Sequence, residues 1–493
     1  AKRNQIDLFR QYALDSVYLN TLQQKVERYN DLFYVILDTN LIVGELYNLT
    51  IAYVGVPQVA INPPWEGGFT WENDLGEENI GVSCEHLGAS AWWPNKDHLS
   101  DKPDSMDIRI IAPKRLKAVA NGNQTSLVSY DALNNLTSWH VSYPINNYNV
   151  TFYLSNFNTF SEQYYRSVTD SLRIDYYVLP QNYDTAVNYY AKTKEIIEVF
   201  EDKFGRYPFS DDGLAFCESP FAGMEHQSAI AIGNNYGKDT LYPIENGIDR
   251  LVVHETAHEW WGNAVAIGDM ADVWINEGMA TYAEHLFVED RSGKEAYLNV
   301  VAENFSDISN VWPMVGDYGV NCDAFKGQDV YYKGAAMMHN LRCLFDDDKS
   351  FFALIKDFYQ ARKSMITTSS DFEEMAQAYT NKDVKPFFEV FFHQASPPVL
   401  KYFPIKKGKN FALFYFWDNV PEGFELPVAL VLNYWDVLRL DVTTELQEIS
   451  YGNIAHYYLP NAYTLDETID LKNSFTYYFS ELMTPEEFIA HYE

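Results

Sequence analysis

The chain has 493 residues, of which 47% are hydrophobic and 16% aromatic, so it can bury a sizeable core and wholesale disorder is excluded. Against 36 Lys and Arg stand 69 Asp and Glu, which gives a formal net charge of −33. A field of that sign repels nucleic acid and anionic lipid, so we expect neither as a partner. No apolar run approaches the roughly 18 residues of a membrane-spanning helix, so we expect no membrane span.

The cysteines and the first residues say little about where the protein works. Four cysteines lie far apart and form no Cys-x-x-Cys pair, which indicates neither a disulfide framework nor a zinc knuckle; they are Cys84, Cys217, Cys322 and Cys343. The chain opens Ala-Lys-Arg-Asn, with neither an initiator Met nor the apolar segment of an export signal. We expect a soluble protein, either cytoplasmic or exported to the periplasm or medium, and the oligomeric state stays open.

The predicted elements change type twice along the chain. The first part has short segments rich in β-branched and aromatic residues, separated by Asn, Gly and Pro, which predict strands over 47–54, 107–112, 138–143 and 149–154. A period of three to four residues then predicts a helix over 186–204 that ends at Gly205. Further helices are predicted over 248–261, 277–288, 330–345, 351–362 and 371–379.

The last part reads as strands again. Ser396-Pro397-Pro398 breaks the helical pattern, and alternating runs predict strands over 411–417, 428–432 and 437–442. A β-rich, then α-rich, then β-rich order favours a multidomain α+β protein of three domains over a single alternating sheet. We place the boundaries at 1–165, 166–396 and 397–493.

A His-Glu-x-x-His motif lies inside the predicted helix 248–261, as His254-Glu255-Thr256-Ala257-His258. Helical residues four apart share a face, so both imidazoles can reach one metal ion, while Glu255 is offset and can hold a water. Catalytic zinc needs a third protein ligand and an open position, and Glu277 on the next predicted helix is a candidate. Glu284, two turns further on, is placed to accept the spare N–H of a ligating histidine.

Together with Glu277, this motif resembles the M1 family of zinc aminopeptidases, which are gluzincins. Gly223-Met224-Glu225-His226 resembles the family's exopeptidase signature Gly-x-Met-Glu-Asn, in a variant ending in His, and Tyr331-Tyr332-Lys333-Gly334 resembles its Tyr-x-Lys-Gly segment. Further similar segments lie at 83–85, 93–97, 62–68 and 258–263, the last two resembling a bacterial branch. The resemblance covers most of residues 50–400, with the motifs in the family's order.

The resemblance implies a zinc-dependent aminopeptidase that hydrolyses the N-terminal bond of peptides. It implies an N-terminal β-sheet domain, a thermolysin-like, mainly helical catalytic domain and a small C-terminal β-sandwich. One Zn²⁺ per chain would be held by His254, His258 and Glu277. Glu255 would be the general base, and Tyr331 would donate a hydrogen bond to the oxyanion of the tetrahedral intermediate.

The substrate would be a peptide with a free N-terminus. The resemblance implies that Glu225, with Glu85 beside it, binds the α-ammonium group, because a buried cation needs paired carboxylates. Gly223 and Met224 would hold the substrate backbone, and Phe221 would line the first side-chain pocket.

Two departures from the family pattern qualify these expectations. Ala222 stands where the signature has its first Gly, and His226 where it has Asn, which affects how the substrate backbone is held more than the amine anchor. Residues 1–165 are fewer than the family's N-terminal domain usually has, so we expect its first strands to be missing, trimmed or disordered.

Other functions stay open at this point. A thermolysin-type zinc endopeptidase shares the two His and the Glu ligands, and one relative in the family is an epoxide hydrolase. A peptide-binding scaffold that kept the fold and lost the chemistry is a third reading. The presence of three ligands, the base and the Tyr argues against the scaffold.

Overall fold

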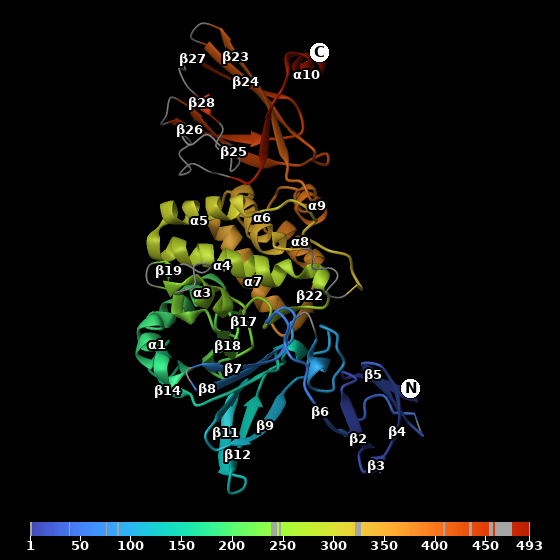
Figure 1. Ribbon diagram of the computed structural model, residues 1–493. Coiled ribbons are helices and arrows are strands. Elements are labelled where there is room, and N and C mark those ends of the chain that lie inside the picture. The colour runs from blue at the N-terminus through green and yellow to red at the C-terminus, as the bar shows by residue number, and fades with distance from the viewer. Residues whose placement is uncertain are drawn as a thin grey trace. The chain divides into compact units, whose positions relative to one another are not determined.

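The computed structural model describes residues 2–38, 40–74, 76–85, 88–237, 244–245, 248–320, 327–407, 410–432, 436–452, 457–458 and 476–492. The chain forms two compact units, one of residues 1–194 with 207–259 and the other of residues 195–206 with 260–493. The expected multidomain α+β architecture is confirmed, since strands dominate the first part, helices follow, and a β-rich region ends the chain (Figure 1). The three domain boundaries placed from the sequence stay a prediction.

The first unit is built mainly of antiparallel sheets with the strand orders β1-β5-β4, β3-β2-β6, β10-β13-β8-β7 and β11-β12-β9. Short alternating segments joined by tight turns are typical of such sheets. The strands are β1 Arg3–Asp7, β2 Tyr12–Leu19, β3 Leu22–Gln23, β4 Lys25–Tyr29, β5 Leu32–Ile36, β6 Leu49–Gly55, β7 Gly68–Asp74, β8 Glu77–Ser83, β9 Met106–Pro113, β10 Lys117–Ala120, β11 Asn123–Ser129, β12 Asn134–Val141 and β13 Phe152–Ser155.

A mixed five-stranded sheet, of order β14-β15-β16-β18-β17, completes the first unit. Strands β15, β16 and β18 run parallel, and β14 and β17 close the two edges antiparallel. The edge strand β17 is only two residues long and ends directly before Glu225. The bounds are β14 Asn158–Tyr165, β15 Ser171–Val178, α1 Tyr183–Tyr189, β16 Leu214–Glu218, β17 Gly223–Met224, β18 Ala229–Ile232, β19 Ile244–Glu245, β20 Ile248–Asp249 and α3 Arg250–Ala257.

The core between these sheets buries one histidine completely. His226 packs edge-on against the rings of Tyr153 and Phe221, and its Nδ1 lies 2.6 Å from the Tyr153 hydroxyl. Desolvation lowers the pKa of His226 to about 3, so the imidazole is neutral in the folded protein at neutral pH. The variant position of the Gly-x-Met-Glu-Asn signature is therefore filled by a core residue.

The second unit packs long helices around buried apolar side chains. The backbones of α4 and α6 touch at a pair of glycines, because a methyl group on Gly278 would lie 2.8 Å from the Cα of Gly334. The helices are α2 Thr193–Lys203, which starts in the first unit, α4 Trp274–Ser292, α5 Lys294–Ser306, α6 Asp329–Phe345, α7 Asp348–Arg362, α8 Ser369–Ala378, α9 Lys385–His393 and α10 Pro485–Tyr492.

The described strands of this unit form a short pair among the helices and a β-rich C-terminal part. β21 Val265–Ile267 pairs in parallel with β22 Met365–Thr367. The C-terminal part has two sheets, of orders β27-β24-β23-β29 and β26-β25-β28, drawn in orange and red in Figure 1. Their strands are β23 Val399–Lys407, β24 Asn410–Asp418, β25 Leu426–Leu432, β26 Asp436–Val442, β27 Gln447–Gly452, β28 Tyr457–Tyr458 and β29 Phe479–Leu482.

Two predicted helices are wrong in their extent. The helix predicted over 186–204 is two helices, α1 and α2, because Tyr190 turns inward to pack against Tyr176 and Phe216. The helix predicted over 248–261 is only Arg250–Ala257, since Asp249 caps its start and Gly262 makes a tight turn with Val265. The strand predicted over 149–154 starts only at Phe152.

Across the described ranges, no helix has the length and apolarity needed to cross a bilayer. Three cysteines are free thiols, namely Cys84, Cys217 and Cys343. Cys322 lies outside the described residues.

Gly278→Ala should destabilise the protein, because the new methyl group would be forced against the backbone of α6. We expect a net loss of about 1–2 kcal/mol in the free energy of unfolding, after allowing for the better helix propensity of Ala. Denaturant titration measures this loss. Gly452→Ala is the control, since no atom lies within 4 Å of its added methyl group; equal stabilities of the two variants would contradict the helix contact.

The buried His226 should make the protein sensitive to acid. The folded-state pKa of about 3 lies below the ordinary value of about 6.5, so between these values the unfolded state binds more protons and stability falls as pH falls. We expect a loss of about 1.5 kcal/mol between pH 6.5 and pH 5 from this group. Denaturant titrations of metal-free protein at both pH values should show a smaller loss for His226→Asn, and parallel losses would rule the assignment out.

Candidate active site

The histidines of the His-Glu-x-x-His motif lie at the C-terminal end of α3. Asp249 starts the helix by accepting the N–H of Leu251, and His254 lies in the last turn. His258 is the first residue past the end of the helix, but its φ of −61° and ψ of −20° are still helical. The two imidazoles therefore keep the common face predicted from their spacing, although the helix is shorter than predicted.

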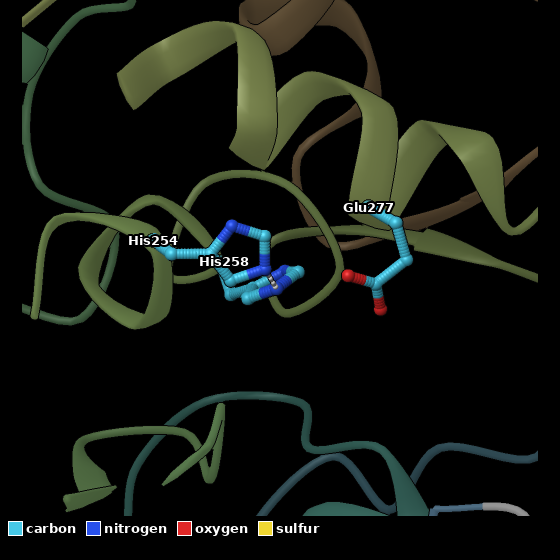
Figure 2. Close-up of side chains that lie close together, drawn as sticks. All are labelled: His254, His258 and Glu277. Atoms are coloured by element: carbon cyan, nitrogen blue, oxygen red, sulfur yellow. Dashed lines mark hydrogen bonds between the residues drawn. The ribbon is translucent and has the colours of Figure 1, made fainter. Parts of the chain in front are cut away.

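The structure brings the three predicted metal ligands together. The Nε2 atoms of His254 and His258 lie 3.1 Å apart. One ligand atom of each histidine and a carboxylate oxygen of Glu277 all lie within 4.8 Å of one another. Figure 2 shows the two rings side by side with the carboxylate of Glu277 facing them. His258 and Glu277 are buried, and His254 is half-buried.

This arrangement fits zinc. Two nitrogens that each lie about 2.0–2.1 Å from a tetrahedral zinc ion are about 3.3 Å apart, close to the separation of the two Nε2 atoms. Two imidazoles and one carboxylate form a three-ligand set of the kind found in catalytic zinc sites, which keep a fourth position open.

A second acidic cluster shares Glu277. Carboxylate oxygens of Glu85, Glu225 and Glu277 lie within 4.8 Å of one another. Glu225 is buried and Glu85 half-buried, and the Tyr148 hydroxyl donates a hydrogen bond to Oε1 of Glu225 at 3.1 Å. The two predicted amine-binding residues therefore lie together and next to a predicted metal ligand.

The predicted base, Glu255, lies against the edge strand β17. A methyl group on Gly223 would lie only 2.6 Å from Oε1 of Glu255 and 2.8 Å from a methyl carbon of Leu251. Gly223 is therefore required for the close approach of the β17 backbone to α3. This contact gives a physical reason for a glycine before Met224 and Glu225.

Tyr331 lies in the first turn of α6 and is half-buried. Lys333, two residues on, is completely buried, and its ammonium group donates to the carbonyl oxygens of Gln394 and Ala395 at 2.6 and 2.8 Å. Burial lowers the pKa of Lys333 to about 8. Lys333 thus links α6 by hydrogen bonds to the segment that follows α9. Gly334 lets α6 contact α4 at Gly278, the residue after Glu277.

The other predicted site residues have mainly buried positions. Phe221 and Met224 belong to the apolar core of the first unit, with Val82 and Cys84. Glu284 is buried on α4, two turns after Glu277. The roles predicted for Phe221 in a side-chain pocket and for Glu284 as partner of a histidine stay predictions.

Sequence reasoning missed three residues that contact this region. They are Tyr148, Asn121 and Glu259, and each reaches the segment around Glu225 from a distant point in the sequence. For Glu259, its place directly after the His-Glu-x-x-His motif could have indicated a role in the site. A single sequence contains no feature that distinguishes Tyr148 among 37 tyrosines, or Asn121 among many asparagines.

Comparison with known proteins agrees with this geometry. Residues 189–391 match the peptidase family M1 domain. The chain is 25% identical over 319 residues to glutamyl aminopeptidase of Sus scrofa, an alignment that covers 61% of this chain and 33% of that protein. The chain thus spans about a third of the length of the curated relatives it matches.

Two solved structures show the same fold. An M1 zinc metallopeptidase from Deinococcus radiodurans superposes with a TM-score of 0.66 at 20% identity, covering 80% of this chain and 86% of that one. Legionella pneumophila aminopeptidase A, in complex with aspartic acid, superposes with a TM-score of 0.77 at 16% identity, covering 99% of this chain and 56% of that one. The matched segment contains His254, His258 and Glu277, so the chain carries a segment similar to the peptidase family M1 domain, on a fold shared with the two solved structures.

Proposed function

We propose that this chain is a zinc-dependent aminopeptidase that removes single residues from the free N-terminus of peptides. The observation that carries the proposal is the pair of clusters joined at Glu277: a zinc-type ligand set on one side and the carboxylates of Glu85 and Glu225 on the other. The names of the matched relatives, which are aminopeptidases, support it.

His254, His258 and Glu277 would hold one zinc ion per chain. When bound, zinc would polarise the scissile carbonyl and lower the pKa of water towards neutrality. Because His258 and Glu277 are buried, a cation bound between them would offset part of the cost of burying the Glu277 carboxylate, which favours occupancy.

Glu225 and Glu85 would bind the α-ammonium group of the substrate. The hydrogen bond from Tyr148 holds the Glu225 carboxylate in one orientation, so the group is prepared for the cation before the substrate arrives. Only a chain end carries this ammonium group, so two carboxylates beside the metal ligands restrict cleavage to the first peptide bond. A thermolysin-type endopeptidase has no need of such a pair.

Glu255 would accept a proton from the attacking water and pass it to the leaving amine. Its position against the backbone of β17 brings this base beside the strand on which the substrate would lie. Gly223 and Met224, at the edge of their sheet, would pair with the substrate backbone as an added strand. Phe221 would line the pocket for the first side chain.

Tyr331 would donate its phenolic hydrogen to the oxygen that becomes negative on the carbonyl carbon. That charge exists only along the reaction path, so the bond lowers the barrier rather than strengthening substrate binding. The contacts of Lys333 and Gly334 support the proposal, because they hold the first turn of α6, which carries Tyr331, against α4 and the segment after α9.

Blocking the substrate amine tests the proposed function directly. We expect a peptide with a free N-terminus to be cleaved one residue at a time, and its N-acetylated form to be at least about 10³-fold slower, because the ammonium anchor is lost. Mass spectrometry of the products measures both. Glu255→Gln is the matched control: it should keep one zinc per chain by metal analysis and lose most turnover. Internal cleavage of the acetylated peptide would indicate an endopeptidase, and a zinc-free, inert chain would indicate a scaffold.

Tyr331→Phe should lower kcat about 10²- to 10³-fold and leave KM within about threefold, because the lost hydrogen bond forms in the transition state. Steady-state kinetics on an aminoacyl reporter measure this, and Tyr332→Phe, on the next residue of the same helix, is the control. A large rise in KM with normal kcat would show that Tyr331 binds the ground state instead.

A further inference from the structure

Glu259 connects the end of the metal-binding motif to the loop that carries Glu225. It follows His258 directly and is completely buried. Its carboxylate accepts the Tyr207 hydroxyl at 2.6 Å and the backbone N–H of Ser228 at 3.0 Å. Burying a carboxylate costs free energy unless it is hydrogen-bonded. The two hydrogen bonds therefore hold the Glu259 carboxylate, the Tyr207 hydroxyl and the Ser228 backbone in fixed positions relative to one another.

Ser228, three residues after Glu225, is held in a conformation that few residues adopt. Its φ of 56° lies in the left-handed region, which is unfavourable for a residue other than glycine. Its hydroxyl donates to the carbonyl of Gln227 at 2.7 Å and accepts the N–H of Gly122 at 2.9 Å. Since this conformation costs energy, it persists only because surrounding contacts, among them that of Glu259, stabilise it.

Asn121 holds the same loop from the opposite side. Its side chain is completely buried and donates to the carbonyl oxygens of Gln227 at 2.8 Å and Asn149 at 3.0 Å. Its Oδ1 accepts the N–H of Thr151 at 2.7 Å. Asn149 is the neighbour of Tyr148, whose hydroxyl bonds Glu225, so Asn121 ties together both segments that reach that carboxylate.

We propose that Glu259 and Asn121 are positioning residues that fix residues 225–228, and with them the amine-binding carboxylate of Glu225, relative to α3. This inference rests on the proposed function of Glu225. A carboxylate recognises an ammonium group efficiently only when it is preorganised at a fixed place, and every group in this network is buried and belongs to the first unit. Neither residue touches the substrate; both act through the backbone of the loop.

The test is the direct binding of two ligands that differ only in the amine. L-leucine hydroxamate and 4-methylpentanehydroxamate are titrated by calorimetry into the zinc-loaded protein, and the ratio of their affinities measures the amine anchor. We expect Glu259→Ala and Asn121→Asp to reduce this ratio at least about tenfold, because the anchor is no longer held in place. Glu259→Gln keeps an acceptor for Ser228 and should stay within about threefold of the unmodified protein.

Tyr207→Phe is the matched control, since it removes the other hydrogen bond of Glu259 and leaves the bond to Ser228. It should change the unfolding temperature but not the affinity ratio. Glu225→Ala should abolish the preference for the amine, and adding Glu259→Ala to it should reduce the ratio no further. Zinc content is measured for every variant.

Two outcomes would overturn the inference: a folded Glu259→Ala protein with an unchanged ratio, or an equal loss of affinity for both hydroxamates. If Glu259→Ala does not fold, Glu259→Asp replaces it, because the shorter side chain cannot reach Tyr207 and Ser228 together. A normal ratio in Glu225→Ala would instead contradict the proposed function, so the two failures are distinguishable.

Discussion

The geometry of the site depends on the close approach of two imidazole nitrogens to each other and to one carboxylate. The Nε2 atoms of His254 and His258 lie 3.1 Å apart, within hydrogen-bonding distance and also at a separation that suits one zinc ion bound to both. Glu277 completes the set. The rest of the site is arranged around this point: the acidic pair Glu85 and Glu225 uses Glu277 as its third member, and Glu255 lies one residue from the first ligand.

Backbone contacts without side chains set the spacing of the functional groups. Gly223 lets the edge strand β17 reach Glu255, and Gly278 with Gly334 lets α4 and α6 touch next to Glu277. At both places the neighbouring atoms would lie within 3 Å of an added methyl group, a distance that side chains do not tolerate. The spacing of the site therefore depends on these glycines as well as on the side chains proposed to carry the chemistry.

Much of the candidate site could be predicted from the sequence because its chemistry depends on short motifs. The spacing of His254 and His258 fixes their common face because His258 keeps a helical conformation, so the two imidazoles lie together despite the error in the helix end. The multidomain α+β architecture could be predicted from the β, α, β order for a similar reason, because the local spacing of apolar residues indicates which elements form. The break of the helix 186–204 at Tyr190 could not be foreseen, because it depends on rings of two distant strands.

The hydrogen bonds that hold the loop around Glu225 could not be predicted from the sequence either, because they join residues that are distant along the chain. Asn121, Tyr148 and Glu259 meet only after sheets that are far apart in sequence have packed, and a buried asparagine reads like any turn residue. His226 shows the converse. Its place in the signature suggested a residue that affects how the substrate backbone is held, whereas the structure buries it as a neutral core residue.

The brevity of β17 has a consequence for selectivity along a bound chain. The strand offers a ladder of only two residues before the buried carboxylate of Glu225 ends it. A peptide paired with this edge could form backbone hydrogen bonds with only these two residues. Most of its binding free energy would then come from its N-terminal residue. Length and composition further downstream would then matter little, as the proposed removal of single N-terminal residues requires.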